Sequence, residues 1–273
     1  MNHLNRELAP ITPEAWKEID EEAASTLKRM LAGRKLFDFQ GPEGWNHAAV
    51  NLGRVKTLKG APQKDARVRQ RIVQPLIESR VPFTLDRDEL EAAGRGAPDI
   101  DLDAVTEAAR KAALMEDGAL FNGYAEAGIT GVMETGEHEP LTITDDYTRY
   151  PSLVAEATNR LRSAGVDGPY AIALGPRCHT ELTRTTDQGY PVMEHVRRLL
   201  KGPIVWAPAV DGAVVVSLRG GDFTLHVGED FSIGYSSHSE SSVTLYVQES
   251  FTSLVFGPEA AVPLRHDTKK KRK

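Results

Sequence analysis

The chain has 273 residues, of which 40% are hydrophobic and 26% charged, and its formal net charge of −6 argues against a surface that binds nucleic acid throughout. The first ten residues contain no apolar signal segment, and no aliphatic run approaches the roughly 20 residues that span a bilayer. A single cysteine, Cys178, excludes an intramolecular disulfide and a cysteine-based zinc cluster, so the totals favour a soluble protein of a reducing cytoplasm.

An amphipathic helix is predicted to begin at Thr12-Pro13-Glu14, with Thr as the N-cap, Pro in the first turn and an acid near the positive end of the helix dipole. Gly33 is the predicted C-cap. A short strand, residues 36–39, should follow, with Asp38 on its other face. The apolar stripe of the helix consists of Trp16, Ile19, Ala23, Leu27, Met30 and Leu31.

Residues 50–78 predict a long projecting hairpin that is poor in apolar residues and rich in basic ones. Residues 54–71 contain seven basic residues and one acid, Asp65. No aromatic residue is interleaved for base stacking, which makes a nucleic-acid patch the weaker of two interpretations. Because an isolated hairpin is at best marginally stable, we expect the arm to lie on its own body or on a neighbouring subunit.

The longest helical signal is Asp101–Tyr124, which would span about 36 Å. Asp99 or Asp101 can cap its start, and Gly123 or Gly128 can end it. It follows a strand at residues 81–85 and an acidic turn at residues 86–89. We expect this spine helix to be a core element without chemistry of its own. Its apolar stripe consists of Leu102, Val105, Ala109, Ala112, Met115, Ala119 and Leu120.

A compact mixed α/β unit is predicted next. Its helices are expected at residues 151–164, from 177, and at 192–201, and its strands at 170–174, 204–206 and 213–218, with a polar turn at 185–190. Three segments then alternate apolar and polar residues, which predicts an antiparallel meander of strands 223–227, 231–235 and 243–247. The final KKKRK is typical of a solvated tail or an expression remnant.

The chain shows no motif of known chemistry. Gly94-Arg95-Gly96 lacks the rest of a dinucleotide fingerprint, and the eight histidines show no metal-binding spacing on a helix. Cys178 and His195 make only a weak nucleophile–base candidate, against the commoner role of a buried cysteine as a small hydrophobe. Glu116 and Asp117 point about 100° apart on a helix, which is more typical of salt-bridged or solvated residues than of an acid–base couple. We therefore expect no metal site, and a structural or assembly protein rather than an enzyme.

Several stretches, taken in order, resemble the encapsulins, the shell proteins of bacterial nanocompartments. They are LNRELAPITPEAWKEID, LAGRKLFDFQGPEGW, VPFTLD, GPYAIALGP, GYPVMEHV, RGGDFTLHVGEDFSIGY and VQESFTSLVF. The resemblance implies the α+β fold of tailed-phage major capsid proteins, with a P-domain that holds the spine helix, an A-domain and an extended E-loop. The implied segments are 1–49 (N-terminal helix and start of the P-domain), 50–78 (E-loop), 79–134 (P-domain with the spine helix), 135–221 (A-domain), 222–266 (C-terminal strands of the P-domain) and 267–273 (basic tail).

The resemblance further implies self-assembly into a closed icosahedral shell in the cytoplasm that loads cargo enzymes through a C-terminal targeting peptide. It is closest to the branch whose cargo is a dye-decolorising peroxidase. The partners expected are copies of the chain itself and this cargo, without nucleic acid or membrane. A secreted bacteriocin-like or hydrolytic factor is the alternative from another class.

Three sites follow from the resemblance. The cargo groove would comprise Leu27, Met30, Leu31, Arg34, Asp38, Phe39, Asp230 and Ile233, unless the apolar members merely seal the helix to its own sheet. The assembly arm would use Arg54, Lys56, Arg67, Arg69 and Arg71. The pore would be lined by Thr186, Asp187, Gln188, Gly189 and Tyr190 at a five-fold axis, unless these form a plain surface turn.

No cofactor is expected. Some members of the family hold a flavin beside a tryptophan, and the corresponding residue here is Arg87. An isoalloxazine ring needs a flat apolar partner to stack on, so we predict that this chain binds no flavin.

Overall fold

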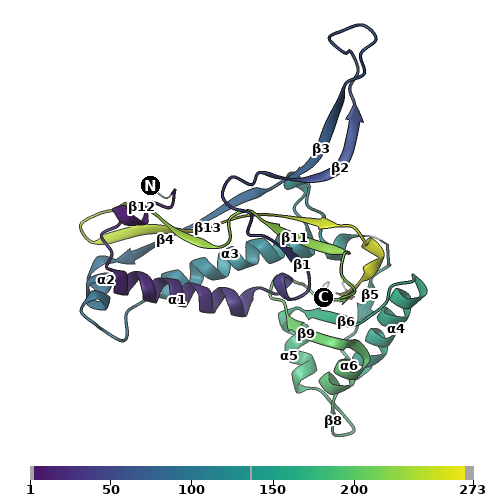
Figure 1. Ribbon diagram of the computed structural model, residues 1–273. Coiled ribbons are helices and arrows are strands. Elements are labelled where there is room, and N and C mark those ends of the chain that lie inside the picture. Colours follow the sequence, from purple (N-terminus) through teal and green to yellow (C-terminus); the bar gives the residue numbers. More distant parts are fainter. Residues whose placement is uncertain (1–2, 136, 268–273) are drawn as a thin grey trace, which may run out of the picture.

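A computed structural model describes residues 3–135 and 137–267, and the basic tail from residue 268 lies outside the described residues. It is an α+β structure with two five-stranded sheets and a projecting two-stranded arm (Figure 1). The helices are α1 (Pro13–Met30), α2 (Arg87–Gly94), α3 (Asp103–Asn122), α4 (Tyr150–Ser163), α5 (Pro176–Arg184) and α6 (Val192–Leu200). The strands are β1 (Asp38–Gln40), β2 (Ala49–Thr57), β3 (Arg69–Pro75), β4 (Ile77–Asp86), β5 (Leu141–Ile143), β6 (Tyr170–Leu174), β7 (Thr186–Asp187), β8 (Tyr190–Pro191), β9 (Lys201–Trp206), β10 (Ala213–Ser217), β11 (Phe223–Val227), β12 (Ser232–His238), β13 (Ser242–Val255) and β14 (Ala261–His266).

The first sheet, with α1, α2 and α3, forms an elongated unit that we call the spine domain (Figure 1). Helix α3 packs on β4 and β13, and α1 packs on α3. Small side chains on α3, such as Ala109 and Ala112, are fully buried or nearly so and let α1 approach closely with Ile19 and Ala23. Among the described residues, no helix is both long enough and apolar enough to cross a membrane.

The predicted meander is wrong, because β11 and β12 lie end to end along one side of the long strand β13. Phe251 pairs with Val227 of β11 on one side and with Ile77 of β4 on the other. Residues 243–248 pair with both β12 and β4, so β12 lies on the same side as β11. The segment 228–230, between two of the predicted strands, is therefore an interruption along one side of β13 and not the turn of a hairpin. Local alternation cannot reveal this, since it marks strands but not their partners.

The second sheet runs in the order β5-β14-β10-β6-β9 and, with α4, α5 and α6, forms a unit that we call the tip domain. Strand β6 is fully buried at every residue and agrees with the predicted strand 170–174. The last strand, β14, pairs with β10 and β5. The chain therefore differs from the division expected at residues 222–266, because its last strand returns to the tip domain instead of staying beside β13.

Three local predictions need correction. Helix α1 ends at Met30, and Gly33 opens a 3₁₀ turn instead of capping the helix, because Asp117 accepts the backbone N–H groups of Ala32 and Gly33. The expected turn after residue 86 is the helix α2, whose first turn is capped by the Asp86 carboxylate. Met115 is not in the buried stripe of α3, since 37% of it is exposed.

The predicted hairpin is confirmed as the arm, β2 and β3, which pair antiparallel and project from the body (Figure 1). The seven basic residues at 54–71 make no ion pair with any residue that the structure describes. The described part of the chain therefore offers these seven basic residues of the arm no acidic partner.

Candidate functional sites

A pocket of about 340 Å³ lies at the C-terminal end of α1, where the helix meets the bend between β11 and β12. Leu27 and Leu31, one helical turn apart, form an apolar wall together with Phe231. Lysine and arginine side chains stand around the wall, with one carboxylate. The lining consists of Leu27, Lys28, Leu31, Arg34, Lys35, Asp230 and Phe231.

Arg34 fixes this end of the pocket, because its guanidinium pairs with three carboxylates. Its Nη2 lies 2.8 Å from Glu116 and 2.7 Å from Glu249, and its Nη1 lies 2.8 Å from Asp230. Glu116 and Glu249 are fully buried, whereas Asp230 is half-exposed at the pocket. The guanidinium also lies over the Phe231 ring, 4.7 Å from its centroid. A charged side chain is thus held rigidly beside an apolar wall.

The excess of carboxylates changes their titration. Burial, with the adjacent Glu116, raises the pKa of Glu249 well above its ordinary value, although Arg34 acts in the opposite direction. Burial also raises the pKa of Asp117 to about 7, despite the hydrogen bonds that it accepts from Ala32 and Gly33. Burial alone would lower the pKa of Arg34, but its three carboxylate partners raise it. Arg34 therefore stays charged, whereas Glu249, one of its three carboxylate partners, takes up a proton more readily than an ordinary glutamate.

Glu116 and Asp117 were predicted to point apart and to be salt-bridged or solvated, and the salt bridge of Glu116 with Arg34 agrees with this. Their side chains do diverge, but residues 32–34 wrap around the helix so that Glu116 meets Arg34 while Asp117 meets Ala32 and Gly33. The Asp117 oxygens lie 2.8 Å from both backbone nitrogens. Both carboxylates therefore fasten the end of α1 to the spine helix, and neither is solvated.

The structure brings only part of the predicted cargo groove together. Leu27, Leu31, Arg34 and Asp230 line the pocket, and Leu27 and Leu31 also belong to the buried core beneath α1. Met30 and Ile233 belong to that core and do not line the pocket. Phe39 is 37% exposed, and its ring centroid lies 5.2 Å from the Arg34 guanidinium.

Asp38 lies outside the pocket and accepts a hydrogen bond from the backbone of Gly221. Sequence reasoning missed Phe231, Lys28 and Lys35. The alternation that places Ile233 on the apolar face also places Phe231 there, and this signal could have found it.

The predicted pore loop is a small hairpin at the far end of the tip domain, labelled β8 in Figure 1. Gln188 and Gly189 both have positive φ, of 47° and 84°, which is the conformation of a tight two-residue hairpin turn. Thr186 and Asp187 are exposed. Tyr190 stacks on His195, with 4.6 Å between the ring centroids. The turn is therefore rigid at its base and polar at its end.

The weak nucleophile–base candidate is not assembled. His195 stacks on Tyr190, while the fully buried Cys178 lies 3.6 Å from the His266 ring and 4.0 Å from the Tyr147 hydroxyl. Burial raises the pKa of the Cys178 thiol, which disfavours the reactive thiolate. Cys178 is a buried packing residue, as its commoner role predicts.

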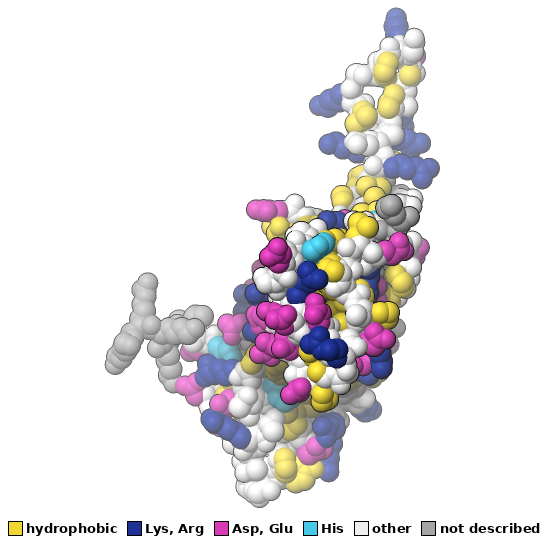
Figure 2. Space-filling model, turned by 90° about the vertical axis from the view of Figure 1, so that its left-hand side faces the viewer, with side chains coloured by type: hydrophobic (Ala, Val, Ile, Leu, Met, Phe, Trp, Pro, Cys, Tyr) yellow, Lys and Arg dark blue, Asp and Glu magenta, His cyan; other side chains and the backbone are white. Residues whose placement is uncertain are grey.

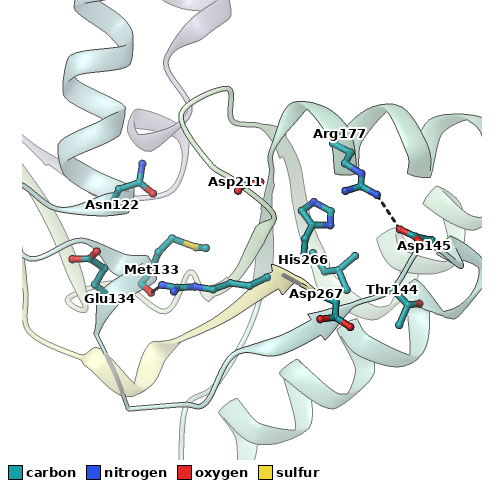
Figure 3. A pocket seen from close by; sticks show the side chains of 11 residues that line it. Asn122, Met133, Glu134, Thr144, Asp145, Arg177, Asp211, His266 and Asp267 are labelled. Carbon is teal, nitrogen blue, oxygen red and sulfur yellow. Dashed lines mark hydrogen bonds and ion pairs between the residues drawn. The ribbon is translucent and has the colours of Figure 1, made fainter. Parts of the chain in front are cut away.

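A larger pocket of about 650 Å³ lies where the two domains meet, beside the end of α3 (Figure 3). Its two arginines are held by its own walls: Arg177 pairs with Asp145 at 3.0 Å, and Arg265 donates to the Met133 carbonyl at 2.9 Å. Figure 3 shows Arg177 and Asp145 facing each other across the rim. No group of three or more His, Cys, Asp or Glu within the described ranges could hold a metal ion.

Arg87, at the predicted flavin position, lies at the start of α2 on the outer end of the spine domain. It pairs with Glu91 at 3.9 Å and reaches the Glu240 carbonyl at 3.5 Å.

Comparison with known proteins identifies the family to which this chain belongs. Residues 1–252 match the family described as "Encapsulating protein for peroxidase". The chain is 53% identical over 271 residues to the type 1 encapsulin shell protein of Rhodospirillum rubrum, with 97% of each chain covered. It belongs to the encapsulin family. A further relative, the type 1 encapsulin shell protein of Mycobacterium tuberculosis, is 46% identical and covers 97% of this chain and 100% of its own.

Solved structures agree on the encapsulin fold. The virus-like particle of Pyrococcus furiosus has a TM-score of 0.63 at 14% identity and covers 91% of this chain and 98% of its own. A chain from the structure of Gordonia phage Cozz has a TM-score of 0.58 at 12% identity, and the match covers 88% of this chain and 87% of the phage chain. The predicted capsid-like α+β fold is confirmed. This encapsulin is a shell protein that self-assembles into a nanocompartment, and it is not an enzyme, so the alternative of a secreted or hydrolytic factor is set aside.

Proposed function

We propose that this shell, in the cytoplasm, loads a dye-decolorising peroxidase through a short C-terminal targeting peptide, and that the peptide binds the pocket at the end of α1. The observation that carries the proposal is the pocket itself, in which Leu27, Leu31 and Phe231 form an apolar wall beside Arg34 and Asp230. An apolar wall with a few fixed polar groups is the usual chemistry of a peptide-binding groove. The family's description as encapsulating protein for peroxidase supports the choice of cargo class.

The residues in and beside the pocket differ in how deeply they are buried. Met30 and Ile233 pack in the core beneath α1, whereas Leu27 and Leu31 pack in that core and also form the pocket wall. Lys28 and Lys35 are exposed and can change without opening the core, and Phe231 is partly buried at its edge. A peptide would place an apolar side chain against Leu27, Leu31 and Phe231, and its polar ends beside the charges at the rim.

The test is cargo loading by shells with Phe231→Ser and Lys28→Glu, compared with Lys111→Glu, an exposed charge change on α3 outside the pocket. The parent, the doubly substituted pocket variant and the control should all assemble. The pocket variant should carry at least about tenfold less co-expressed cargo, as expected for the loss of a central apolar contact and a rim charge. Equal loading of the pocket variant and the control would place the peptide elsewhere.

The identity of the cargo is tested separately. Shells purified from the native host should contain a dye-decolorising peroxidase whose C-terminal peptide, fused to a fluorescent protein, is sufficient for loading. A different enzyme inside the shell would overturn the cargo assignment while leaving the pocket assignment intact.

We also propose that the arm is an assembly arm, with Arg54, Lys56, Arg67, Arg69 and Arg71 directed to other subunits, and that residues 186–190 line a pore. The first assignment is supported by the lack of ion pairs between these basic residues and the described part of the chain. The exposed, rigidly based turn at the end of the tip domain supports the second.

A further inference from the structure

The described chain passes between the spine domain and the tip domain at three connections, 123–140, 218–222 and 256–260. Figure 1 shows the tip domain on the side of the spine domain opposite the arm, and Figure 2 shows the same from a quarter turn away. The two domains share apolar core residues, such as Phe121 of α3 and Val262 of β14. Apolar burial is non-directional and keeps the domains in contact, so directional bonds are needed to fix the angle between them.

Arg219 lies in the second connection and binds the third. Its guanidinium forms a fork with the Asp222 carboxylate, with Nε 2.9 Å from Oδ2 and Nη2 2.7 Å from Oδ1. Nη2 also lies 3.1 Å from the Glu259 carboxylate in the third connection, and Nη1 lies 3.3 Å from the Gly165 carbonyl of the tip domain. Bidentate charge-assisted hydrogen bonds are strong and orient both partners. One planar group therefore joins two connections and the tip domain.

The residues that follow Arg219 let the connections approach closely. Gly220 and Gly221 have φ values of 83° and 82°, a left-handed conformation that glycine adopts without strain. The N–H of Gly221 donates to the Asp38 carboxylate at 2.6 Å, which ties this connection to β1 of the spine domain. In the third connection, a Cβ at Gly257 would lie 2.1 Å from an oxygen of the Asp222 carboxylate. Both domains thus contact one short segment.

We propose that Arg219 is a positioning residue that fixes the angle between the spine domain and the tip domain, and that this angle sets the curvature and uniform size of the shell. A closed shell repeats the same contacts between identical chains, so a change of angle inside each chain accumulates around the shell. Without the fork, the two glycines would give the second connection little resistance to rotation. This role needs only the self-assembly of the chain, not the cargo pocket or the arm.

Substitutions at Arg219 test this role through the size of the shells. Arg219→Gln removes the cation, and Arg219→Lys keeps the charge but cannot form the planar fork. The Arg219 side chain is 31% exposed, so its loss should change the melting temperature little. Arg6→Gln is the matched control, because Arg6 is 30% exposed and forms the same kind of fork with Asp20 of α1, within the spine domain.

The measurements are the distribution of shell masses by native mass spectrometry and the distribution of shell diameters by electron microscopy. Arg219→Gln should widen both at least about twofold relative to the parent, Arg219→Lys should widen them less, and Arg6→Gln should leave them unchanged. Gly257→Ala tests the same contact from the third connection, because its Cβ would displace the Asp222 carboxylate without removing a charge. It should widen both distributions as well.

Uniform shells of the parent's size from Arg219→Gln, or an equal spread from Arg6→Gln, would overturn the proposal. Folded protomers that do not assemble would also overturn it, because the role assigned to Arg219 concerns the size of the shell and leaves assembly intact. If circular dichroism shows that Arg219→Gln does not fold, Arg219→Lys and Gly257→Ala decide by the same criteria.

Discussion

Arg34 and Glu249 lie 2.7 Å apart although 215 residues separate them, and this contact ties the end of the first helix to the middle of the longest strand. Glu116 on α3 completes the junction. The Arg34 guanidinium thus joins the end of α1 to α3 and β13, beside the proposed cargo pocket.

This junction predicts the response to two substitutions. Arg34→Met should destabilise the protein by about 3–5 kcal/mol, because Glu116 and Glu249 would remain buried without a cation. Glu249→Gln should cost much less, since its amide keeps an oxygen for Arg34 and offers a donor toward Glu116. Thermal melting of assembled shells at one protein concentration measures both. Equal losses would show that Glu249 is ionised in the native protein.

The same carboxyls predict a pH dependence. Because the pKa values of Glu249 and Asp117 are raised in the native state, native protein binds more protons than unfolded protein, and stability falls as pH rises. For Asp117 this loss extends from about pH 4 to about pH 7 and is of the order of 4 kcal/mol. Between about pH 5 and about pH 8, the melting temperature should fall more steeply with rising pH for the parent than for Glu249→Gln. The same dependence of melting temperature on pH in both proteins would contradict the raised pKa of Glu249.

Two glycines near Asp117 predict opposite effects of the same substitution. A Cβ at Gly33 would lie 2.3 Å from the Leu120 side chain, whereas a Cβ at Gly118 would have nothing within 4 Å. Gly33→Ala should therefore lower stability by about 1–3 kcal/mol through overpacking. Gly118→Ala should raise it by up to about 1 kcal/mol through its helix preference. Urea titration of each shell compares them, and a neutral Gly33→Ala would mean that the α1–α3 junction is looser than its contacts indicate.

Deleting residues 54–71 should yield folded but unassembled protomers, because the arm adds little to the core of its own chain. Circular dichroism should report an intact fold, and size exclusion should report a small particle. Normal shells from this deletion would refute the assembly arm.

The turn at residues 186–190 predicts charge-dependent entry. If symmetry multiplies Asp187 into a ring of carboxylates, anions should be slowed at the opening while small neutral molecules pass. Asp187→Lys should leave assembly intact, because the residue is exposed, and should raise turnover of anionic dyes relative to neutral substrates by an encapsulated peroxidase. The free enzyme is the control. An unchanged ratio in the two shells would mean that entry occurs elsewhere or is not set by charge.

Local patterns in the sequence determined the elements that depend on near neighbours. The start of α1 at Thr12 and Pro13, the buried stripe of α3, the hairpin of the arm and strand β6 all follow from caps and hydrophobic periodicity, which act over a few residues. Four residues of the pocket, Leu27, Leu31, Arg34 and Asp230, were also anticipated, with the family resemblance as the guide to where they would serve.

Only the tertiary structure decided which distant residues share a surface. In it, β11 and β12 lie end to end along β13, and β14 pairs with the strands of the tip domain. Glu116 and Glu249 both form ion pairs with Arg34. The tertiary structure also showed that Leu31, but not Met30, lines the pocket, although both belong to the core beneath α1. The physical reason is that periodicity specifies which face of an element is apolar, whereas the partner of that face, and the pairing of a buried charge, depend on how the whole chain closes around it.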